Sequence, residues 1–424
     1  MFSSEWVSYK TLVNLIGARL PDAFFIAGGE HFTAAPQLSM DQCPALDAII
    51  RGEGEETLVE LASALENKRS LEFVPGLVLR NRSLNQTYIF TPPRSRIKSI
   101  DEIPLPTWDL VEMQNYFETD STYGVNLGKS MPMLASRGCP YQCTFCSSPQ
   151  MWGTRWVART PSLLIDEIEM YIHKYQITNI DFYDLTAIVK KDWIIEFCNE
   201  LISRNLNITW QLPSGTRSEA IDEAVCKLLY QSGCRNMNYA PESGSENVLK
   251  EIKKKIKLSR LLDSLNSAVK AGINVKMNII IGFPFETHLD IWKTIIFLVR
   301  LSWMGAHDVS IGVFAPYPGS ELYDSLVESG KITHSDEYWE KLAYVDISKT
   351  VSYSNTITSS MLVFYNFLGF AVFYGSNYLF RPNRLYRTIK NLISGQHESR
   401  GEMALHQIIT RFAYLAKKKL FNFS

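Results

Sequence analysis

The stretch Ser136-Arg137-Gly138-Cys139-Pro140-Tyr141-Gln142-Cys143-Thr144-Phe145-Cys146 is the most informative part of this 424-residue chain. Its three cysteines follow an apolar run and have C-x3-C-x2-C spacing. Four-iron iron–sulfur clusters normally take four thiolates. A loop that offers three of them leaves one iron open for a substrate or a cofactor. We therefore predict Cys139, Cys143 and Cys146 as metal ligands.

A zinc site is the other common explanation for clustered cysteines. It needs two such pairs, or one pair with histidines nearby. The nearest histidines in the sequence, His31 and His173, are both far from the loop. The spacing therefore disfavours zinc.

Composition and charge fit a packed globular enzyme. Hydrophobic residues make up 46% of the chain and aromatic residues 12%, and the net charge of −1 gives no sign of a nucleic-acid-binding surface. A chain of this length is expected to form two or three domains. The other cysteines suggest no disulfide framework, and residues 1–10 show no signal-peptide pattern. We expect a reducing, cytoplasmic location. The scattered cysteines are Cys43, Cys198, Cys226 and Cys234.

Residues 131–340 alternate between strand and helix patterns. Six strand–helix units fit a partial (β/α)6 barrel better than a full eight-stranded barrel. In parallel barrels the chemistry lies at the carboxyl ends of the strands. The expected strands are residues 133–135, 179–183, 208–212, 236–240, 275–281 and 309–314, and the expected helices are residues 162–175, 192–203, 219–231, 259–271 and 288–304.

The cysteine spacing, with Phe145 directly before Cys146, resembles the signature of the radical S-adenosylmethionine (radical SAM) enzymes. In that family the open iron binds the amino and carboxylate groups of SAM. One electron then cleaves SAM to methionine and a 5′-deoxyadenosyl radical, which takes hydrogen from the substrate. The resemblance implies a [4Fe-4S] cluster, SAM, a small-molecule substrate, and an electron donor such as flavodoxin or ferredoxin.

Residues at the strand ends are the candidates for binding SAM. By its position, Asp184 could bind the methionyl amine, and the neighbouring Asp181 is as readily a turn cap. Glu242 and Ser243 stand where ribose hydroxyls and the SAM carboxylate could bind at a helix N-terminus, although Ser243 or Ser245 could instead cap that helix.

The fifth strand and the cysteine loop supply the candidates for the adenine site. Ile281 and Gly282 end a strand that resembles the family's adenine-binding strand, and Phe145 could stack on the base. Arg217, after the third strand, is the catalytic candidate because it could pair with a carboxylate at the barrel mouth. For Arg155, in a Trp-Gly element after the cysteines, a solvated surface position is the default.

Residues 1–70 resemble the second half of the cobalamin-binding Rossmann-like domain that precedes many radical SAM cores. The resemblance rests on Gly28-Gly29-Glu30-His31 and Gly52-Glu53-Gly54-Glu55, and it makes Gly28 and Gly29 cobalamin-binding candidates. The sequence contains no D-x-H-x-x-G motif, whose histidine ligates cobalt in that domain. We expect a truncated domain with an exposed apolar edge at residues 23–27. An upstream segment or a second chain would complete it, or its cobalamin function has been lost. His31 is as readily an ordinary loop histidine as a substitute ligand.

Residues 71–130 are expected to be a linker with a small hairpin, and residues 341–424 a helical region. Residues 361–380 are uncharged and long enough to span a membrane. Their polar and aromatic content favours a helix packed on the barrel, and a Phe-Tyr … Arg-Pro element at residues 373–382 resembles the cobalamin-type proteins. The basic residues that follow allow at most weak contact with an anionic membrane surface.

The resemblance is closest to the group that contains the anaerobic magnesium-protoporphyrin IX monomethyl ester cyclases and many methylases. Three functions remain open: cobalamin-dependent methylation of an unactivated carbon, radical cyclisation or rearrangement without methyl transfer, and a non-catalytic, degenerate subunit. The substrate is not readable from the residues.

Overall fold

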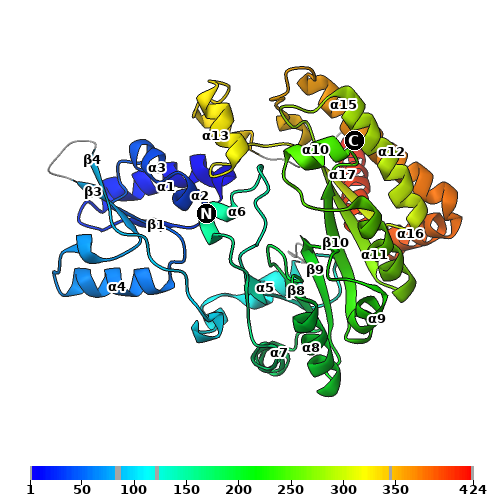
Figure 1. Ribbon diagram of the computed structural model, residues 1–424, viewed down its shortest axis with the longest axis horizontal. Helices are drawn as coiled ribbons and strands as arrows, with labels where there is room; N and C mark the ends of the chain where they lie inside the picture. The colour runs from blue at the N-terminus through cyan, green and yellow to red at the C-terminus, as the bar shows by residue number, and fades with distance from the viewer. Residues whose placement is uncertain (1, 82–86, 120–123, 343–345, 422–424) are drawn as a thin grey trace.

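The structure is a computed structural model that describes residues 2–81, 87–119, 124–342 and 346–421, with side chains described up to residue 410. A small N-terminal sheet lies at one end of the molecule, a six-stranded parallel sheet at its centre, and a group of C-terminal helices at the other end (Figure 1). The predicted α/β class and the helical C-terminal region are confirmed.

The central sheet has the strand order β12-β11-β10-β9-β8-β5, with every neighbouring pair parallel. This sequential order follows because each strand is followed by a connection that returns the chain to the same end of the sheet. The strands are β5 (Ser130–Met133), β8 (Asn179–Phe182), β9 (Thr209–Thr216), β10 (Cys234–Glu242), β11 (Asn274–Ile281) and β12 (Asp308–Val313). The helices between them are α7 (Pro161–Tyr175), α8 (Lys191–Ser203), α9 (Glu223–Gln231), α10 (Glu246–Glu251), α11 (Leu258–Ala271) and α12 (His288–Met304).

Several predicted boundaries differ from the observed ones: β9 runs on to Thr216 rather than ending at residue 212, and β10 is longer at both ends than residues 236–240. Two further differences have local reasons. The first strand begins at Ser130 rather than at residue 133, and residues 134–135 already belong to the turn into the cysteine loop. Helix α9 begins at Glu223 rather than at residue 219, because the Asp222 side chain accepts a hydrogen bond from the Val225 N–H and caps the helix there.

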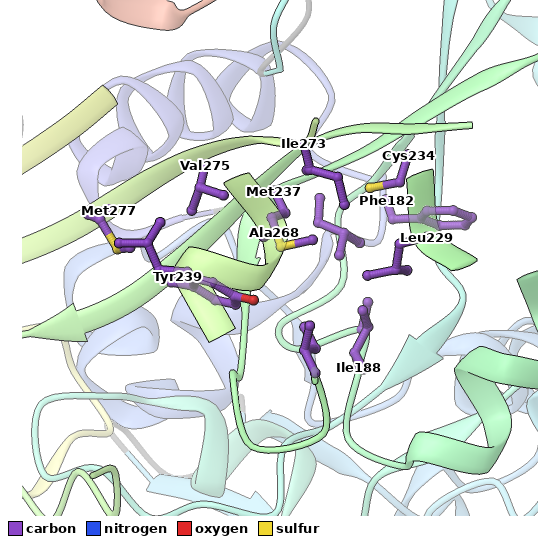
Figure 2. Close-up of a cluster of buried hydrophobic side chains, with 14 of the residues drawn as sticks. Phe182, Ile188, Leu229, Cys234, Met237, Tyr239, Ala268, Ile273, Val275 and Met277 are labelled. Carbon is purple, nitrogen blue, oxygen red and sulfur yellow. The ribbon is translucent and has the colours of Figure 1, made fainter. Parts of the chain in front are cut away.

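Strand β11 shows how the core is built. Buried and half-buried residues alternate along it, so that Val275, Met277, Ile279 and Ile281 face the helices. Figure 2 shows part of this core, where side chains of β10 and β11 meet those of α9 and α11. The opposite, half-buried face of β11 carries Lys276 and Asn278 among its residues.

The N-terminal sheet has the order β1-β2-β3-β4. Strands β1 (Ile26–Gly28) and β2 (Ala48–Ile50) are parallel, and the predicted hairpin, β3 (Leu77–Asn81) and β4 (Thr87–Phe90), adds to β2 in antiparallel fashion. The sheet is therefore mixed, and β1 is an edge strand of it. The accompanying helices are α1 (Trp6–Arg19), α2 (Glu30–Ala34), α3 (Pro36–Gln42) and α4 (Glu55–Glu66), with 3-10 turns at Ser3–Glu5 and Leu71–Phe73.

The N-terminal part and the central sheet share a hydrophobic core. Trp6, Phe32 and Ile49 belong to the same buried cluster as Phe283 and Trp339. The two parts are therefore joined by apolar packing. Residues between them form 3-10 turns at Ile100–Glu102 and Trp108–Leu110, and helix α5 (Met113–Glu118).

The long helix α15 (Ser359–Phe380) packs against β12 and α12. Two asparagines on its buried side bond to backbone carbonyls: Asn366 Nδ2 donates to Ile311 O at 2.6 Å and Asn377 Nδ2 to Ala306 O at 2.7 Å. The predicted packing of this segment on the barrel agrees with these contacts. The remaining helices are α13 (Glu321–Glu328), α14 (Asp336–Glu340), a 3-10 turn at Ile347–Lys349, α16 (Pro382–Ser394) and α17 (Arg400–Phe421).

Candidate active site

The cysteine loop lies at the carboxyl end of β5. It runs from β6 (Ser136–Arg137), which pairs with β7 (Val157–Ala158), to α6 (Ser148–Trp152). Thr144 anchors its middle, because its N–H donates to Ile252 O at 3.1 Å and its carbonyl accepts from the Leu322 N–H at 2.9 Å. Cys139, Cys143 and Cys146 are all free and partly exposed.

A glycine and an aspartate set the entry to this loop. Gly138 has a φ of +86°, and a Cβ there would lie 2.3 Å from the carbonyl oxygen of Arg155, so no other residue fits. The buried carboxylate of Asp184 accepts from the Ala135 N–H at 3.0 Å and from the Ser136 hydroxyl at 2.5 Å. Burial raises the pKa of Asp184 to about 6. Asp184 thus fixes the start of the cysteine loop, and both of its carboxylate oxygens accept hydrogen bonds from the protein.

The donor set fits a [4Fe-4S] cluster. Among the described residues no group of three His, Cys, Asp or Glu side chains converges on a single ion position. A four-iron cluster does not require such convergence, since each thiolate binds a different iron. Burial raises the pKa of Cys143, and that of Cys146 to about 12, while the charges of Lys254 and Arg217 act on Cys143 in the opposite direction. Iron would replace the thiol protons.

A buried ion pair lies beside Cys143. Glu242, the last residue of β10, has a φ of +66°, a strained conformation for a residue with a side chain. Its carboxylate accepts from Lys254 Nζ at 2.7 Å, and both side chains are less than a tenth exposed. Burial alone would lower the pKa of Lys254, but Glu242 and Cys143 outweigh this and raise it. The pair places a fixed ammonium next to the cluster loop.

Arg217 supports the same loop from the end of β9. Its guanidinium lies 3.7 Å from the centre of the Tyr141 ring, between the first two cysteines. It also donates to Lys255 O at 2.7 Å and pairs with Glu219 at 2.9 Å. The predicted catalytic residue is therefore close to the cysteines, and it is held by several partners at once.

Phe145 lies beside the end of β11. Its ring is 5.7 Å from that of Phe283, which in turn packs against Phe285 and Phe314. The structure thus brings together the two stretches predicted for adenine binding. The Ile281 side chain belongs to the core under the helices, and its carbonyl accepts from the Phe314 N–H at 2.8 Å.

Gly282 has a φ of +89°, and a Cβ there would lie 2.9 Å from Leu362 of α15. A bulky residue at this position would disturb the packing of α15 as well as any ligand. The turn is fixed by Glu286, whose Oε2 accepts from the N–H groups of Gly282 and Phe283. Burial raises the pKa of Glu286 to about 8.

Ser243 and Asp181 have protein partners away from the cysteines. The Ser243 hydroxyl lies 3.0 Å from that of Thr294 on α12 and accepts from the Ser245 N–H at 3.1 Å. Asp181 accepts from Asn179 Nδ2 and Gln211 Nε2, both at 2.7 Å. Burial raises the pKa of Asp181 to about 6.

The loops after β1 and β2 face the cysteine loop. Glu53 and Glu55 pair with Arg137 at 3.3 Å and 2.6 Å, and Glu30 accepts from the Ser147 hydroxyl at 2.6 Å. Gly28 pairs with Ile50 inside the sheet, and Gly29 has a φ of +105° at the start of α2. The N-terminal glycine-rich segments therefore lie near the cysteine loop.

His31 does not fit as a cobalt ligand. It is 1% exposed, its ring stacks on Trp6 at 4.8 Å and meets the edge of Trp339 at 5.1 Å. Its Nδ1 bonds to the Ser3 hydroxyl at 2.9 Å, and its buried Nε2 has no partner among the described residues. Burial lowers its pKa to about 3. It is a neutral core histidine.

The sequence reasoning missed Lys254. Lys254 lies in the run Lys253-Lys254-Lys255, which looks like a solvated surface, and only the fold shows that it is buried. Arg155 was expected to be solvated. It is exposed, but its guanidinium donates to the Ile97 carbonyl and so ties the linker to the loop.

A separate cavity lies away from the cysteines. Its volume is about 640 Å³, and it is lined by α15, α16, α17 and the amino-terminal residues of β12. It is therefore at the opposite end of the strands from the cysteines.

The chain belongs to the radical SAM superfamily. The family described as the radical SAM superfamily matches residues 133–298, which include the three cysteines and most of the parallel sheet. The cluster loop at the carboxyl end of this sheet is therefore that of a radical SAM enzyme, and [4Fe-4S] and SAM are its implied cofactors.

Relatives place it near methyltransferases and cyclases of this superfamily. An uncharacterized methyltransferase of Pyrococcus horikoshii is 32% identical over 328 residues, covering 77% of this chain and 67% of the relative. The anaerobic magnesium-protoporphyrin IX monomethyl ester cyclase of Rubrivivax gelatinosus is 25% identical over 321 residues, covering 75% of this chain and 56% of the relative. The chain thus spans about half to two thirds of the length of such relatives.

A solved structure shares the fold. The radical S-adenosylmethionine methyltransferase TsrM of Kitasatospora setae, with cobalamin and a [4Fe-4S] cluster bound, matches with a TM-score of 0.61 and 18% identity. The match covers 77% of this chain and 61% of that one. The predicted resemblance to the cobalamin-related radical SAM enzymes is confirmed.

Proposed function

We propose that this enzyme cleaves SAM reductively at a [4Fe-4S] cluster held by Cys139, Cys143 and Cys146, and that it methylates an unactivated carbon with cobalamin as the methyl carrier. When bound, the cluster and SAM supply the hard chemistry, in which one electron gives methionine and a 5′-deoxyadenosyl radical that takes a hydrogen atom from the substrate. The observation that carries the proposal is the position of the three cysteines at the carboxyl end of a six-stranded parallel sheet.

The residues around the loop would orient the cofactor and keep the site dry. Lys254 and Arg217 supply positive charge beside Cys143, which favours thiolate ligands and an anionic carboxylate nearby. Phe145 and Phe283 form an apolar wall at the end of β11, suited to a stacked base. An electron donor such as flavodoxin or ferredoxin would reduce the cluster.

Methylation is favoured over cyclisation by the named methyltransferases among the similar proteins. Radical cyclisation is the second candidate, because a cyclase is also similar over three quarters of this chain. The N-terminal loops that face Arg137 and Ser147 are where we would place cobalamin. Since the His31 ring is enclosed by Trp6 and Trp339 in the core, we assign it no role in holding cobalt.

Product analysis separates the two candidates. The reconstituted protein is reduced under anaerobic conditions and supplied with SAM, cobalamin and a small-molecule extract. A methyl group that leaves SAM leaves S-adenosylhomocysteine behind, so methylation predicts both this product and 5′-deoxyadenosine. Cyclisation predicts 5′-deoxyadenosine alone. A protein with a full cluster that forms no 5′-deoxyadenosine would contradict the proposal and favour a non-catalytic subunit.

A further inference from the structure

Helices α12 and α15 expose a continuous apolar surface. We define the apolar face as the exposed residues Leu289, Trp292, Ile296 and Trp303 of α12 and Met361, Phe364, Phe367 and Leu379 of α15; they are between 37% and 77% exposed. The two helices pack side by side, and Trp292 contacts Tyr365 while Trp303 contacts Phe380 across the seam. Exposed apolar patches of this kind mark interaction surfaces.

The apolar face is built into the sequence of both helices. On α12, Leu289, Ile296 and Trp303 recur at seven-residue intervals, so they lie along one side of the helix. On α15, Leu362, Gly369 and Phe373 face the protein, and the intervening residues on the other side carry no charge. Among the described residues, α15 is the one helix that is long and apolar enough to cross a membrane. Only 28% of its most apolar 18-residue stretch is buried inside the protein.

Helix α15 is bound to the rest of the protein along its length, so it does not span a bilayer by itself. Asn366 and Asn377 bond to carbonyls near β12. At the end of the helix, Arg381 donates to the Ser302 carbonyl at 2.6 Å and to the Trp303 carbonyl at 2.8 Å, which caps α12. A helix that is held along its whole length exposes its other side to the solvent, and it can lie parallel to a membrane surface as interfacial helices do.

The charges beside the apolar face are positive. Lys293 and Arg300 lie on the exposed side of α12 next to the apolar stripe. The one acidic residue of α12, Asp290, is buried and lies 3.7 Å from Lys293, so Arg300 is the cation of α12 without an acidic neighbour on its own helix. Helix α15 has no charged residue, and α16 contributes the exposed Lys390, whereas Arg387 of α16 lies 3.6 Å from Glu398. From residue 359 to residue 424 the chain has nine basic residues and two acidic ones, although its overall net charge is −1.

We propose that the apolar face docks the enzyme flat on an anionic phospholipid surface. Aromatic residues, tryptophan above all, favour the membrane–water interface, and neighbouring lysines and arginines pair with anionic headgroups. A second copy of the chain fits less well, because a symmetric contact would bring Lys293 and Arg300 of both copies together. This inference is independent of the reaction that the cluster supports.

Vesicle binding tests the proposal. The full chain is sedimented with vesicles of phosphatidylcholine alone and of phosphatidylcholine with about one third phosphatidylglycerol. We expect binding to the anionic vesicles that salt weakens and that alkaline carbonate reverses. Equal binding to both vesicles, no binding to either, or resistance to carbonate would each overturn the proposal.

Two pairs of substitutions localise the surface. Ile296→Ser with Phe364→Ser should reduce binding at least tenfold. Arg300→Glu with Lys390→Glu should reduce binding to anionic vesicles by at least about fivefold for each of the two basic residues lost. The matched controls are Phe73→Ser with Leu110→Ser, two apolar residues elsewhere that are more exposed than Ile296 and Phe364, and Lys68→Glu with Lys98→Glu. Both control pairs should bind like the wild type.

The folded state and the oligomeric state are checked in the same samples. Each variant should keep the thermal midpoint of the wild type; if the first pair unfolds, Leu289→Ser replaces it, since Leu289 is 65% exposed. A wild-type dimer that Ile296→Ser and Phe364→Ser convert to a monomer would overturn the proposal in favour of a second copy. Variants and controls that bind vesicles equally would overturn it as well.

Discussion

At the scale of single residues, the buried ion pair of Glu242 and Lys254 depends on the fold and could not be predicted from the sequence. Lys254 is buried while its neighbours Lys253 and Lys255 are not, because Lys254 points at the carboxylate that ends β10. A pattern of three consecutive lysines indicates a solvated turn. The pairing of residues 242 and 254 depends on the path of the chain after α10. No local sequence pattern predicts that path.

Removing Lys254 alone should be costly. Lys254→Met leaves the Glu242 carboxylate buried and unpaired, and we expect a loss of about 3–5 kcal/mol in the free energy of unfolding. Denaturant titration of the apoprotein measures it. The control is Lys253→Met, which breaks an exposed pair with Glu321 and should cost less than about 1 kcal/mol. The double variant Glu242→Gln with Lys254→Met should recover most of the loss. Equal effects of Lys254→Met and Lys253→Met would refute the burial of this pair.

Glu286 predicts a pH dependence of stability. Because burial raises its pKa from 4.5 to about 8, the folded state holds its proton over an interval in which the unfolded state releases it. The contribution to stability is therefore full below pH 4.5 and is lost as the pH rises through 8, by up to about 1.4 kcal/mol per pH unit. Glu286→Gln should remove this slope. Unfolding titrations at several pH values check it, and an unchanged slope in the variant would contradict the assignment.

At the scale of elements, the strands and helices of the central sheet were predictable because their apolar periodicity is local. The predicted α12 agrees with the observed His288–Met304, where the Thr287 hydroxyl caps the first turn. The pairing of the hairpin with β2 and the short β6–β7 ladder were not predictable. They bring together residues that are distant or irregular in sequence, so that no periodicity marks them.

The turn at Gly138 is the element on which the cluster loop depends. Gly138→Ala would place a Cβ against the Arg155 carbonyl oxygen and force a left-handed conformation, so we expect loss of bound iron and a lower thermal midpoint. Gly153 is the matched control, since it has a φ of +61° and no atom within 4 Å of its Cβ position. Gly153→Ala should cost about 1–3 kcal/mol through its strained backbone and leave the iron content unchanged. Equal iron contents in the two variants would argue against this role of Gly138.

At the scale of the whole molecule, the superfamily was readable from one loop, and the arrangement of its parts was not. The cysteine spacing and six strand–helix units were enough for the radical SAM core. Of the predicted site residues, Phe145, Arg217 and Glu242 gather around the cysteines, whereas Asp184, Ser243 and Ile281 are engaged within the protein. Position at a strand end is a local property, but whether a side chain faces the loop depends on packing.

The central claim is that the three loop cysteines hold one four-iron cluster. The direct test is the iron and sulfide content of anaerobically reconstituted protein, measured for the wild type and for two triple variants. We expect about four irons per chain in the wild type and none bound as a cluster after replacement of Cys139, Cys143 and Cys146 by alanine. Replacement of the buried Cys198, Cys226 and Cys234 by alanine should leave the content unchanged in the protein that folds. A full cluster in the first variant, or its loss from a folded second variant, would contradict the account.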